Sequence, residues 1–504
     1  MVISNQNTHI VPYWTSDFTL KSGLNQLGIR TVSEQLFTTL LPGLNNVSLR
    51  IRYYSFYCWI ISKFYEGKYS IEDKDFYPFI RRAELLLALI NATLDDHSGI
   101  PGINFATDLI AKNGLDCTFS LADGADIGLS GKTYWANAGG VLRQYYGASL
   151  EEIGVIGLSN NSSLLYNITR VNNLVNGQSL AESFSQTIGK YGEVFLAIVE
   201  RGFVTGSELK ELNRAFGMKK MPKSPERNLL CDMLMQSDTP ASEISATYRR
   251  ETILYILEYL VSGNLTLNAT DFARYMYDKF RDGDHRMTVW GWFAYYLNDN
   301  WQYYLTGIFS EILNSLKKRD NIWVPIGALS DELVDNVIDE FGANGETTLE
   351  EIVLNMPYRD LRGKNSKYIH SLLHLYQENL EYNEDSEQRF HEIGINSENF
   401  CDFVKRTHAS MKHSFKSFVK KLLEDIIYRH YRVSFRKMLQ TGLQTQKFAF
   451  ENGNLRFLDS WETTHTSPRI DTMRNFMSDL GLIKYDEETD RLTDFGRELL
   501  ETCK

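Results

Sequence analysis

Residues 468–501, PRIDTMRNFMSDLGLIKYDEETDRLTDFGRELLE, hold the pattern that is most informative about the fold. Pro468 suits the first turn of a helix, because its fixed φ angle matches that turn, and Gly481 suits the end of the helix. Residues 482–493 contain two short strand-like stretches around a polar turn, and a last helix is expected at 494–501. Four apolar residues at helical spacing predict the buried face of the first helix: Ile470, Met473, Met477 and Leu480.

A second hairpin is predicted shortly before this stretch. Residues 447–457, KFAFENGNLRF, alternate apolar and polar side chains on both sides of Asn452 and Gly453. An Asn-Gly pair tolerates the positive φ angles that a tight hairpin turn requires. The sequence therefore predicts two adjacent strands at this position.

The order of helix, hairpin and helix resembles the end of a winged-helix module. Residues 149–156 are similar to residues 477–483, so an earlier copy of the same pattern is expected. We therefore predict two winged-helix-like units, one near residues 120–185 and one near residues 440–504.

Helical periodicity dominates the rest of the chain. Residues 49–64 place apolar side chains on one helical face, and residues 241–318 favour long packed helices. The predicted fold class is mainly α, a multi-helix body with two small winged-helix-like (α+β) modules. The predicted domains are an N-terminal helical domain (1–119), a winged-helix-like module (120–200), a central helical domain (201–398), and a basic helix with a C-terminal winged-helix-like module (399–504).

The composition excludes several classes of protein. The 504 residues include 53 Lys and Arg against 64 Asp and Glu, and the net charge of -11 excludes binding to nucleic acid through bulk positive charge. No apolar run approaches the ~20 residues of a spanning helix, and no secretory signal precedes the first helix, so a cytoplasmic protein without membrane partners is expected. Neither a cofactor nor a metal site is predicted. The cysteines are odd in number and scattered, which argues against disulfides and structural zinc: Cys58, Cys117, Cys231, Cys401 and Cys503.

A local basic segment nevertheless lies between Lys405 and Lys437. Apolar residues recur there at helical spacing, so the segment is expected to form a helix with one dry face and a ridge of lysines outside. Such a ridge suits the phosphates of a nucleic-acid backbone. The alternative interpretation is a solvated face that pairs with the acidic residues between Glu378 and Glu387. The candidate nucleic-acid-binding residues are Lys412, Lys416, Lys420, Arg429 and Arg432.

Candidate catalytic residues are few. Arg406 and His413, near the start of a long predicted helix, resemble the Arg-x4-6-His motif of HEPN-type ribonucleases. That resemblance implies that the arginine stabilises charge on phosphorus and that the histidine transfers protons. The acidic residues and histidines at 95–97 and 282–285 lack the spacing of a metal site.

A longer resemblance concerns residues 27–59, LGIRTVSEQLFTTLLPGLNNVSLRIRYYSFYCW. They are similar to an N-terminal signature of uncharacterised bacterial proteins that are often encoded in antiphage defence islands. Residues 430–437, 467–469 and 479–482 look like the C-terminal part of the same group. The resemblance implies a cellular context and no particular mechanism.

Together these observations predict a non-catalytic binding or scaffold subunit of a bacterial antiviral defence complex. Its expected partners are a nucleic-acid backbone, DNA or RNA, and other defence proteins, among which an ATPase is a candidate. Two alternatives stay open: a HEPN-like metal-independent ribonuclease that uses Arg406 and His413, and a kleisin-like bridge between ATPase subunits.

Overall fold

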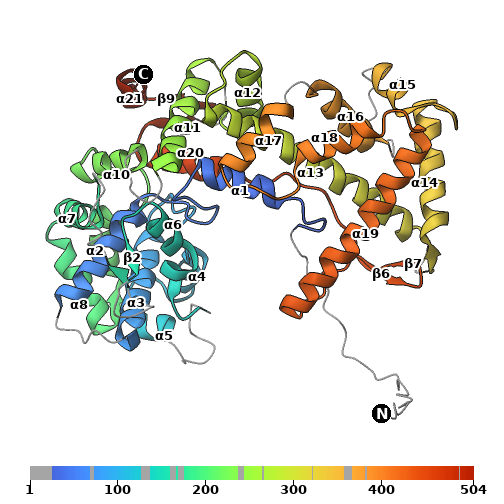
Figure 1. Cartoon of the computed structure of the whole chain (residues 1–504). Helices are drawn as coiled ribbons and strands as arrows, with labels where there is room; N and C mark the ends of the chain where they lie inside the picture. The colour runs from blue at the N-terminus through green and yellow to red at the C-terminus, as the bar shows by residue number, and fades with distance from the viewer. Residues whose placement is uncertain are drawn as a thin grey trace, which may run out of the picture. The chain divides into compact units, whose positions relative to one another are not determined.

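The computed structural model describes most of the chain, and the described residues are mainly helical (Figure 1). The prediction of a mainly α protein is therefore confirmed. None of the described helices has both the length and the apolar composition that crossing a bilayer requires. The described residues are 25–67, 73–126, 137–158, 166–167, 175–236, 243–263, 266–319, 322–356, 366–380, 383–486 and 489–503.

The contacts within the chain define two compact units, and neither is one continuous segment. The first unit comprises the described residues of 1–33 and 297–466, and the second comprises those of 34–296 and 467–504. The predicted division into four consecutive domains stays a prediction. The two units cut across it, because each combines stretches that lie far apart in the sequence.

The core of the second unit forms around α2 (Arg52–Glu66), which lies alongside α7 (Gly177–Ile188) (Figure 1). The predicted apolar face of α2 is buried, and so are most residues on its other sides, because neighbouring helices surround it. Phe56 and Trp59 of α2 pack edge-on or tilted against rings from other helices, an arrangement that aromatic pairs favour. The three partner rings are Phe184, Phe195 and Phe216.

The remaining elements of the second unit are mostly helices joined by short antiparallel strand pairs. Two helices, α1 (Thr31–Leu40) and α13 (Met287–Lys317), have residues in both units. The others are α3 (Asp73–Asn91), α4 (Ile103–Asn113), β1 (Thr118–Ser120), α5 (Leu121–Ala125), the π-helical turn η1 (Leu142–Tyr146), α6 (Gly147–Glu152), β2 (Gly157–Leu158), β3 (Tyr166–Asn167), α8 (Tyr191–Arg201), β4 (Phe203–Thr205), α9 (Gly206–Phe216), α10 (Pro225–Met235), α11 (Glu243–Val261), α12 (Ala269–Arg281), α20 (Ile470–Asp479), β8 (Ile483–Asp486), β9 (Thr489–Leu492) and α21 (Asp494–Cys503).

The C-terminal end has the predicted order of helix, hairpin and helix, formed by α20, β8, β9 and α21. Asp490 of β9 is buried and accepts hydrogen bonds from the Leu267 backbone N–H at 2.9 Å and from Arg474 Nε at 2.8 Å. These bonds fix the hairpin to the loop before α12 and to α20. The helices and the hairpin are confirmed, whereas their assignment to a winged-helix module stays a prediction.

The earlier copy of this pattern also has a helix, a strand pair and a helix, formed by α6, β2, β3 and α7. Gly154 follows α6 with a φ of 87°, and Gly481 follows α20 with a φ of 69°. Both positions need a left-handed backbone that glycine adopts without strain. The residues between β2 and β3 lie outside the described ranges, so this module also stays a prediction.

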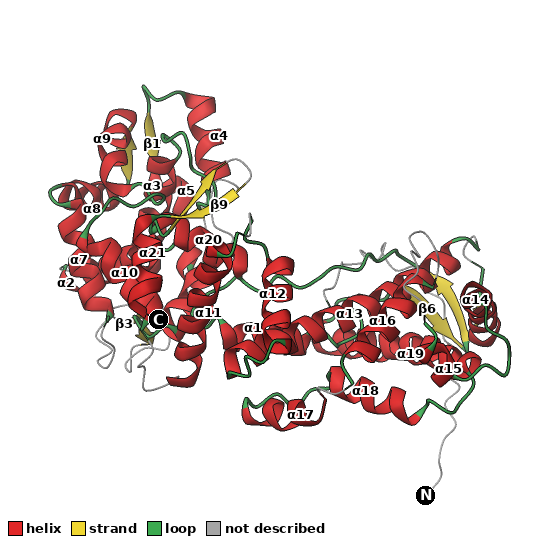
Figure 2. Ribbon diagram, turned by 90° about the horizontal axis from the view of Figure 1, so that it is seen from above, coloured by secondary structure: helices red, strands yellow, loops and turns green. Residues whose placement is uncertain are grey.

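The first unit contains a three-stranded antiparallel sheet in the order β5-β7-β6, which lies beside α14 and α19 (Figure 2). The predicted hairpin is confirmed, and Asn452 and Gly453 have φ angles of 48° and 75° at its turn. The third strand was not predicted. The elements of this unit are β5 (Val324–Pro325), α14 (Ile326–Phe341), α15 (Leu349–Leu354), α16 (Lys367–Glu378), α17 (Asn383–Glu392), α18 (Phe400–Ala409), α19 (Phe415–Thr441), β6 (Phe448–Glu451) and β7 (Asn454–Phe457).

Candidate nucleic-acid interface

The predicted basic segment forms two helices, α18 and α19, and not one. Asn399 caps α18, because its side chain accepts a hydrogen bond from the Cys401 N–H at 2.9 Å. Ser414 caps α19 in the same way through the Ser417 N–H at 3.3 Å, and Gly442 ends that helix. The segment therefore has a turn in its middle, and only residues after Ser414 share one helical face.

The dry face predicted for α19 is present. Five apolar residues at helical spacing are buried on this face: Phe415, Val419, Leu423, Ile426 and Ile427. His430 continues this face, donating from Nδ1 to the Gln26 carbonyl oxygen at 3.1 Å and accepting from the Lys447 N–H at 3.0 Å. Burial lowers the pKa of His430 to about 4, so the imidazole is neutral near pH 7.

The predicted lysine ridge is only partly formed. Lys412 lies in the turn before α19, so the prediction that it stacks on the helix with the other lysines is wrong. Lys416 and Lys420 are on the helix and form ion pairs with Asp335 at 2.8 Å and Asp331 at 2.7 Å. Both acids belong to α14. The alternative interpretation, which placed the acidic partners between Glu378 and Glu387, holds for one other cation of the segment, since Lys405 pairs with Glu387 at 2.5 Å. Lys416 and Lys420 each already have an acidic partner, and a phosphate would have to displace that acid in order to bind the lysine.

Arg429 is also paired. It contacts Glu398, which lies 2.6 Å from Arg406 as well. Burial alone would raise the pKa of Glu398, but the two guanidinium groups hold it below its usual value. Of the five predicted residues, Lys412 and Arg432 remain without an ion pair to another described residue.

The ribonuclease candidates lie on different elements. Arg406 is in the last turn of α18, and His413 is in the turn before α19. The prediction that both occupy the start of one long helix is therefore wrong. The described contacts pair Arg406 with Glu398, and none joins it to His413. The arrangement gives no support to a shared catalytic role.

The most exposed face of α19 lies opposite its buried side and combines cations with aromatic and aliphatic residues. Tyr428 is 40% exposed, Phe435 42% and Leu439 71%. The cations of this face are exposed and form no ion pair with another described residue. We call this face the outer stripe; its residues are Lys421, Asp425, Tyr428, Arg432, Phe435, Arg436 and Leu439, so one acid lies among three cations.

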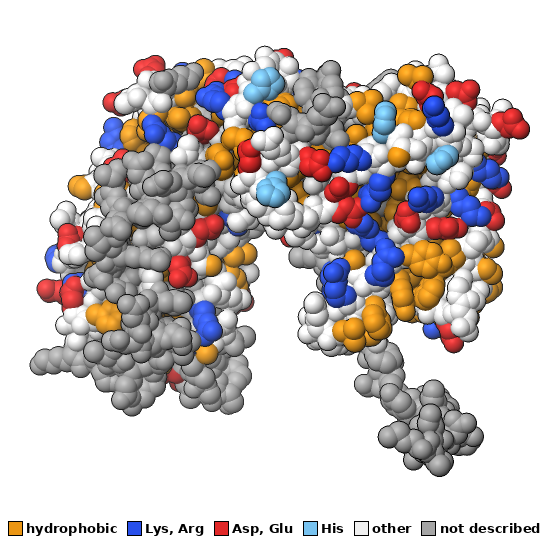
Figure 3. All heavy atoms as spheres, in the orientation of Figure 1, with side chains coloured by type: hydrophobic (Ala, Val, Ile, Leu, Met, Phe, Trp, Pro, Cys, Tyr) orange, Lys and Arg blue, Asp and Glu red, His pale blue; other side chains and the backbone are white. Residues whose placement is uncertain are grey.

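The aromatic rings of the outer stripe are held in place by their neighbours. Tyr431 stacks on Phe435 with the ring centroids 6.1 Å apart, and Phe450 of β6 packs against Tyr431 at 4.6 Å. Phe450 also contacts the edge of Tyr428 at 6.2 Å. Figure 3 shows Lys and Arg side chains along α19 beside an apolar patch that extends over the β6–β7 hairpin. The ring contacts therefore fix the aromatic side chains of the outer stripe without a bound ligand.

Sequence reasoning missed the aromatic part of this surface. The signal was present, since Lys421, Tyr428, Arg432, Phe435 and Leu439 follow the 3.6-residue helical period on the side opposite the apolar face. The number of cations in the segment does not by itself show which aromatic residues share their face. The contact with Phe450 was not readable, because it depends on how the hairpin packs.

Two further polar groups in the described part of the chain are bound to neighbouring side chains. Trp292 of α13 is buried and donates from Nε1 to Thr252 Oγ1 at 3.0 Å. Asp284 is bound by Arg286 and Tyr255. Within the described ranges, no three His, Cys, Asp or Glu side chains gather in a way that could hold a metal ion.

Comparison with known proteins adds nothing to this geometry: no protein-family model, no curated protein and no solved structure matches the chain.

Proposed function

We propose that the chain is a non-catalytic nucleic-acid-binding subunit of a cytoplasmic bacterial complex, and that the outer stripe contacts a single strand. The observation that carries this proposal is the alternation of unpaired cations and exposed rings along α19. From Lys421 to Leu439 the stripe extends for about 27 Å, which is long enough to follow several nucleotides.

Each part of the stripe matches one part of a nucleic-acid strand. Arg432 and Arg436 offer charge-assisted hydrogen bonds to phosphate oxygens. Tyr428 and Phe435 offer ring faces on which bases stack, and about 10 Å of helix separates them. Bases are accessible for stacking in a single strand and are hidden in a duplex, so the stripe favours a single strand.

The wider context rests on the sequence. The similarity of residues 27–59 to proteins from antiphage defence islands supports a role in an antiviral complex with protein partners. The separation of Arg406 from His413 gives no reason to prefer a ribonuclease, and a bridge between ATPase subunits has no specific observation in its favour.

Truncating the rings of the stripe is expected to weaken single-strand binding. Tyr428→Ala and Phe435→Ala should each lower the affinity for a dT or rU oligonucleotide by about 5- to 150-fold, because each lost stack is worth about 1–3 kcal/mol. Fluorescence anisotropy with labelled single-stranded and duplex oligonucleotides measures this. Phe203→Ala is the matched control, since Phe203 is 45% exposed on β4 in the second unit.

Three outcomes contradict the proposal. They are wild-type protein that prefers the duplex, stripe variants that bind as well as wild type, and a loss in the Phe203→Ala control as large as theirs. If no oligonucleotide binds and the stripe variants instead lose a co-purifying protein, the face is a protein-docking surface and the nucleic-acid proposal fails.

A further inference from the structure

The second unit contains a cavity of about 870 Å³ beside its C-terminal helices and hairpin. One wall comes from α20, β8, β9 and the start of α21, and the other comes from residues 219–227 with Arg50 and Asp96. The volume is in the range of sites that hold small molecules of nucleotide size. The proposed function makes no use of this cavity.

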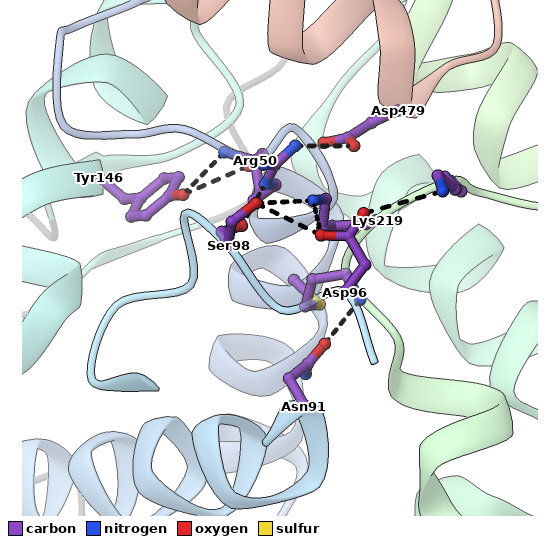
Figure 4. Close-up of polar contacts among 9 residues, drawn as sticks. Arg50, Asn91, Asp96, Ser98, Tyr146, Lys219 and Asp479 are labelled. Carbon is purple, nitrogen blue, oxygen red and sulfur yellow. Dashed lines mark hydrogen bonds and ion pairs between the residues drawn. The ribbon is translucent and has the colours of Figure 1, made fainter. Parts of the chain in front are cut away.

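Four of the cations that line the cavity form ion pairs with carboxylates, namely Arg50, Lys219, Lys220 and Arg474, and Figure 4 shows the first two. Arg50 donates from Nη1 to Asp479 Oδ1 at 3.0 Å and from Nε to the Ser98 carbonyl oxygen at 3.1 Å. Lys219 contacts Asp96 and donates to Ser98 Oγ at 2.8 Å. Burial raises the pKa of Asp479 to about 7, and the charge of Arg50 opposes that shift only in part. The ion pairs and hydrogen bonds hold Arg50 and Lys219 in the wall of the cavity.

Arg227 differs from them, because no described residue supplies it with a carboxylate. It is 9% exposed, and its Nε is buried without a hydrogen-bond partner among the described residues. Its guanidinium lies over the Phe495 ring, 4.7 Å from Cζ to the ring centroid. A buried donor without a partner is unfavourable, since Nε has lost its water and gained no hydrogen bond in exchange. The environment of Arg227 therefore favours an anion.

Two exposed lysines and one ring add to this environment. Lys223 and Lys484 line the cavity, and neither forms an ion pair with another described residue. Tyr485 also lines it and is 58% exposed. Arg474 lies 4.4 Å from the centroid of that ring and is itself bound to buried Asp490, so the ring is held in place. The lining carries seven Lys and Arg side chains against four carboxylates, of which Asp494 is one, so the cavity combines a net positive charge with an exposed aromatic surface.

We propose that this cavity binds the phosphate groups of a nucleotide-sized ligand, with Arg227 as the anchor and Lys223 and Lys484 as further phosphate contacts. A guanidinium binds two phosphate oxygens at once, and lysines add mobile point charges. Tyr485 offers a surface on which a base can stack. A free nucleoside triphosphate and a 5′-phosphorylated strand end present the same chemistry. The inference is independent of the outer stripe, which belongs to the first unit.

Calorimetric titration of the full chain with ATP, GTP and inorganic tripolyphosphate tests this proposal. Wild type is expected to bind at least one of them, and Lys223→Glu with Lys484→Glu is expected to weaken that binding at least about tenfold. Lys210→Glu on α9, an exposed lysine outside the cavity, should leave the affinity unchanged. Oligonucleotides with a 5′-phosphate or a 5′-hydroxyl distinguish a strand end from a free nucleotide.

The variant Arg227→Gln allows a second measurement, the melting temperature of the ligand-free protein. This variant should also weaken binding at least about tenfold, without lowering the melting temperature of the ligand-free protein, because it removes a buried Nε donor that has no partner among the described residues. The proposal is overturned if none of the phosphate probes binds, or if the cavity variants bind as well as wild type. It is also overturned if Arg227→Gln lowers the melting temperature and keeps the affinity, since Arg227 would then be structural.

Discussion

Glu226→Ala is expected to lower the free energy of unfolding by about 3–5 kcal/mol, the usual result of leaving one partner of a buried ion pair alone. Arg52 and Glu226 form a two-pronged pair, with Nε to Oε1 and Nη2 to Oε2 both at 3.1 Å. The side chains are 3% and 0% exposed. The alanine leaves the Arg52 charge buried among the Ala215 and Gly217 carbonyl oxygens without a counter-ion. Urea unfolding followed by circular dichroism measures the loss.

Two controls separate this effect from general sensitivity to mutation. Asp278→Ala removes an exposed pair with Arg274, whose side chains are 54% and 52% exposed, and should change stability by less than about 1 kcal/mol. Arg52→Met with Glu226→Leu removes both buried charges and should recover much of the loss. A Glu226→Ala protein as stable as Asp278→Ala would show that the buried pair is not formed.

Gly496→Ala is expected to destabilise the C-terminal end of the chain by about 1–3 kcal/mol, as overpacking does. A Cβ on Gly496 would overlap the Leu482 carbonyl oxygen and lie 3.2 Å from the Leu482 carbonyl carbon. A backbone carbonyl cannot rotate away as a side chain can. The new methyl group would therefore push α21 away from Leu482, the residue before β8. Hydrogen exchange of the β8 and β9 amides should accelerate in this variant.

Gly327→Ala on α14 is the matched control, because a Cβ there meets no atom within 4 Å. It should leave amide exchange and stability unchanged or slightly improved, since alanine favours helix. Unchanged exchange of β8 and β9 in Gly496→Ala would mean that α21 does not pack on the hairpin as described.

Local sequence signals predicted the hairpins and the C-terminal helices well. Asn452 and Gly453 have positive φ angles, the conformation that an Asn-Gly pair at a hairpin turn favours. Gly481 likewise ends α20 where the periodicity stops. These features depend on residues within one turn of each other, so one sequence is sufficient to find them. Whether they assemble into winged-helix modules depends on packing between distant segments.

The non-local features could not be predicted in the same way. β5 pairs with β7 although Val324 and its partner Leu455 are far apart in the chain. The ion pairs of Lys416 and Lys420 reach back to Asp335 and Asp331 on another helix. Charge along one helix shows which cations exist, and only the fold shows which of them are already neutralised.

The salt dependence of oligonucleotide binding tests the central claim most directly, because the slope of log K against log salt reports the phosphates that are neutralised. Arg432→Gln with Arg436→Gln should reduce the magnitude of that slope by about 1.4 for a single strand. The matched control removes the two ion pairs between α19 and α14 and leaves the net charge unchanged. Its four substitutions are Lys416→Gln, Lys420→Gln, Asp331→Asn and Asp335→Asn. The slope measured for this control should equal that of the wild type. An equal reduction in the control, or an unchanged slope in the arginine variant, would contradict the assignment of the outer stripe as the nucleic-acid interface.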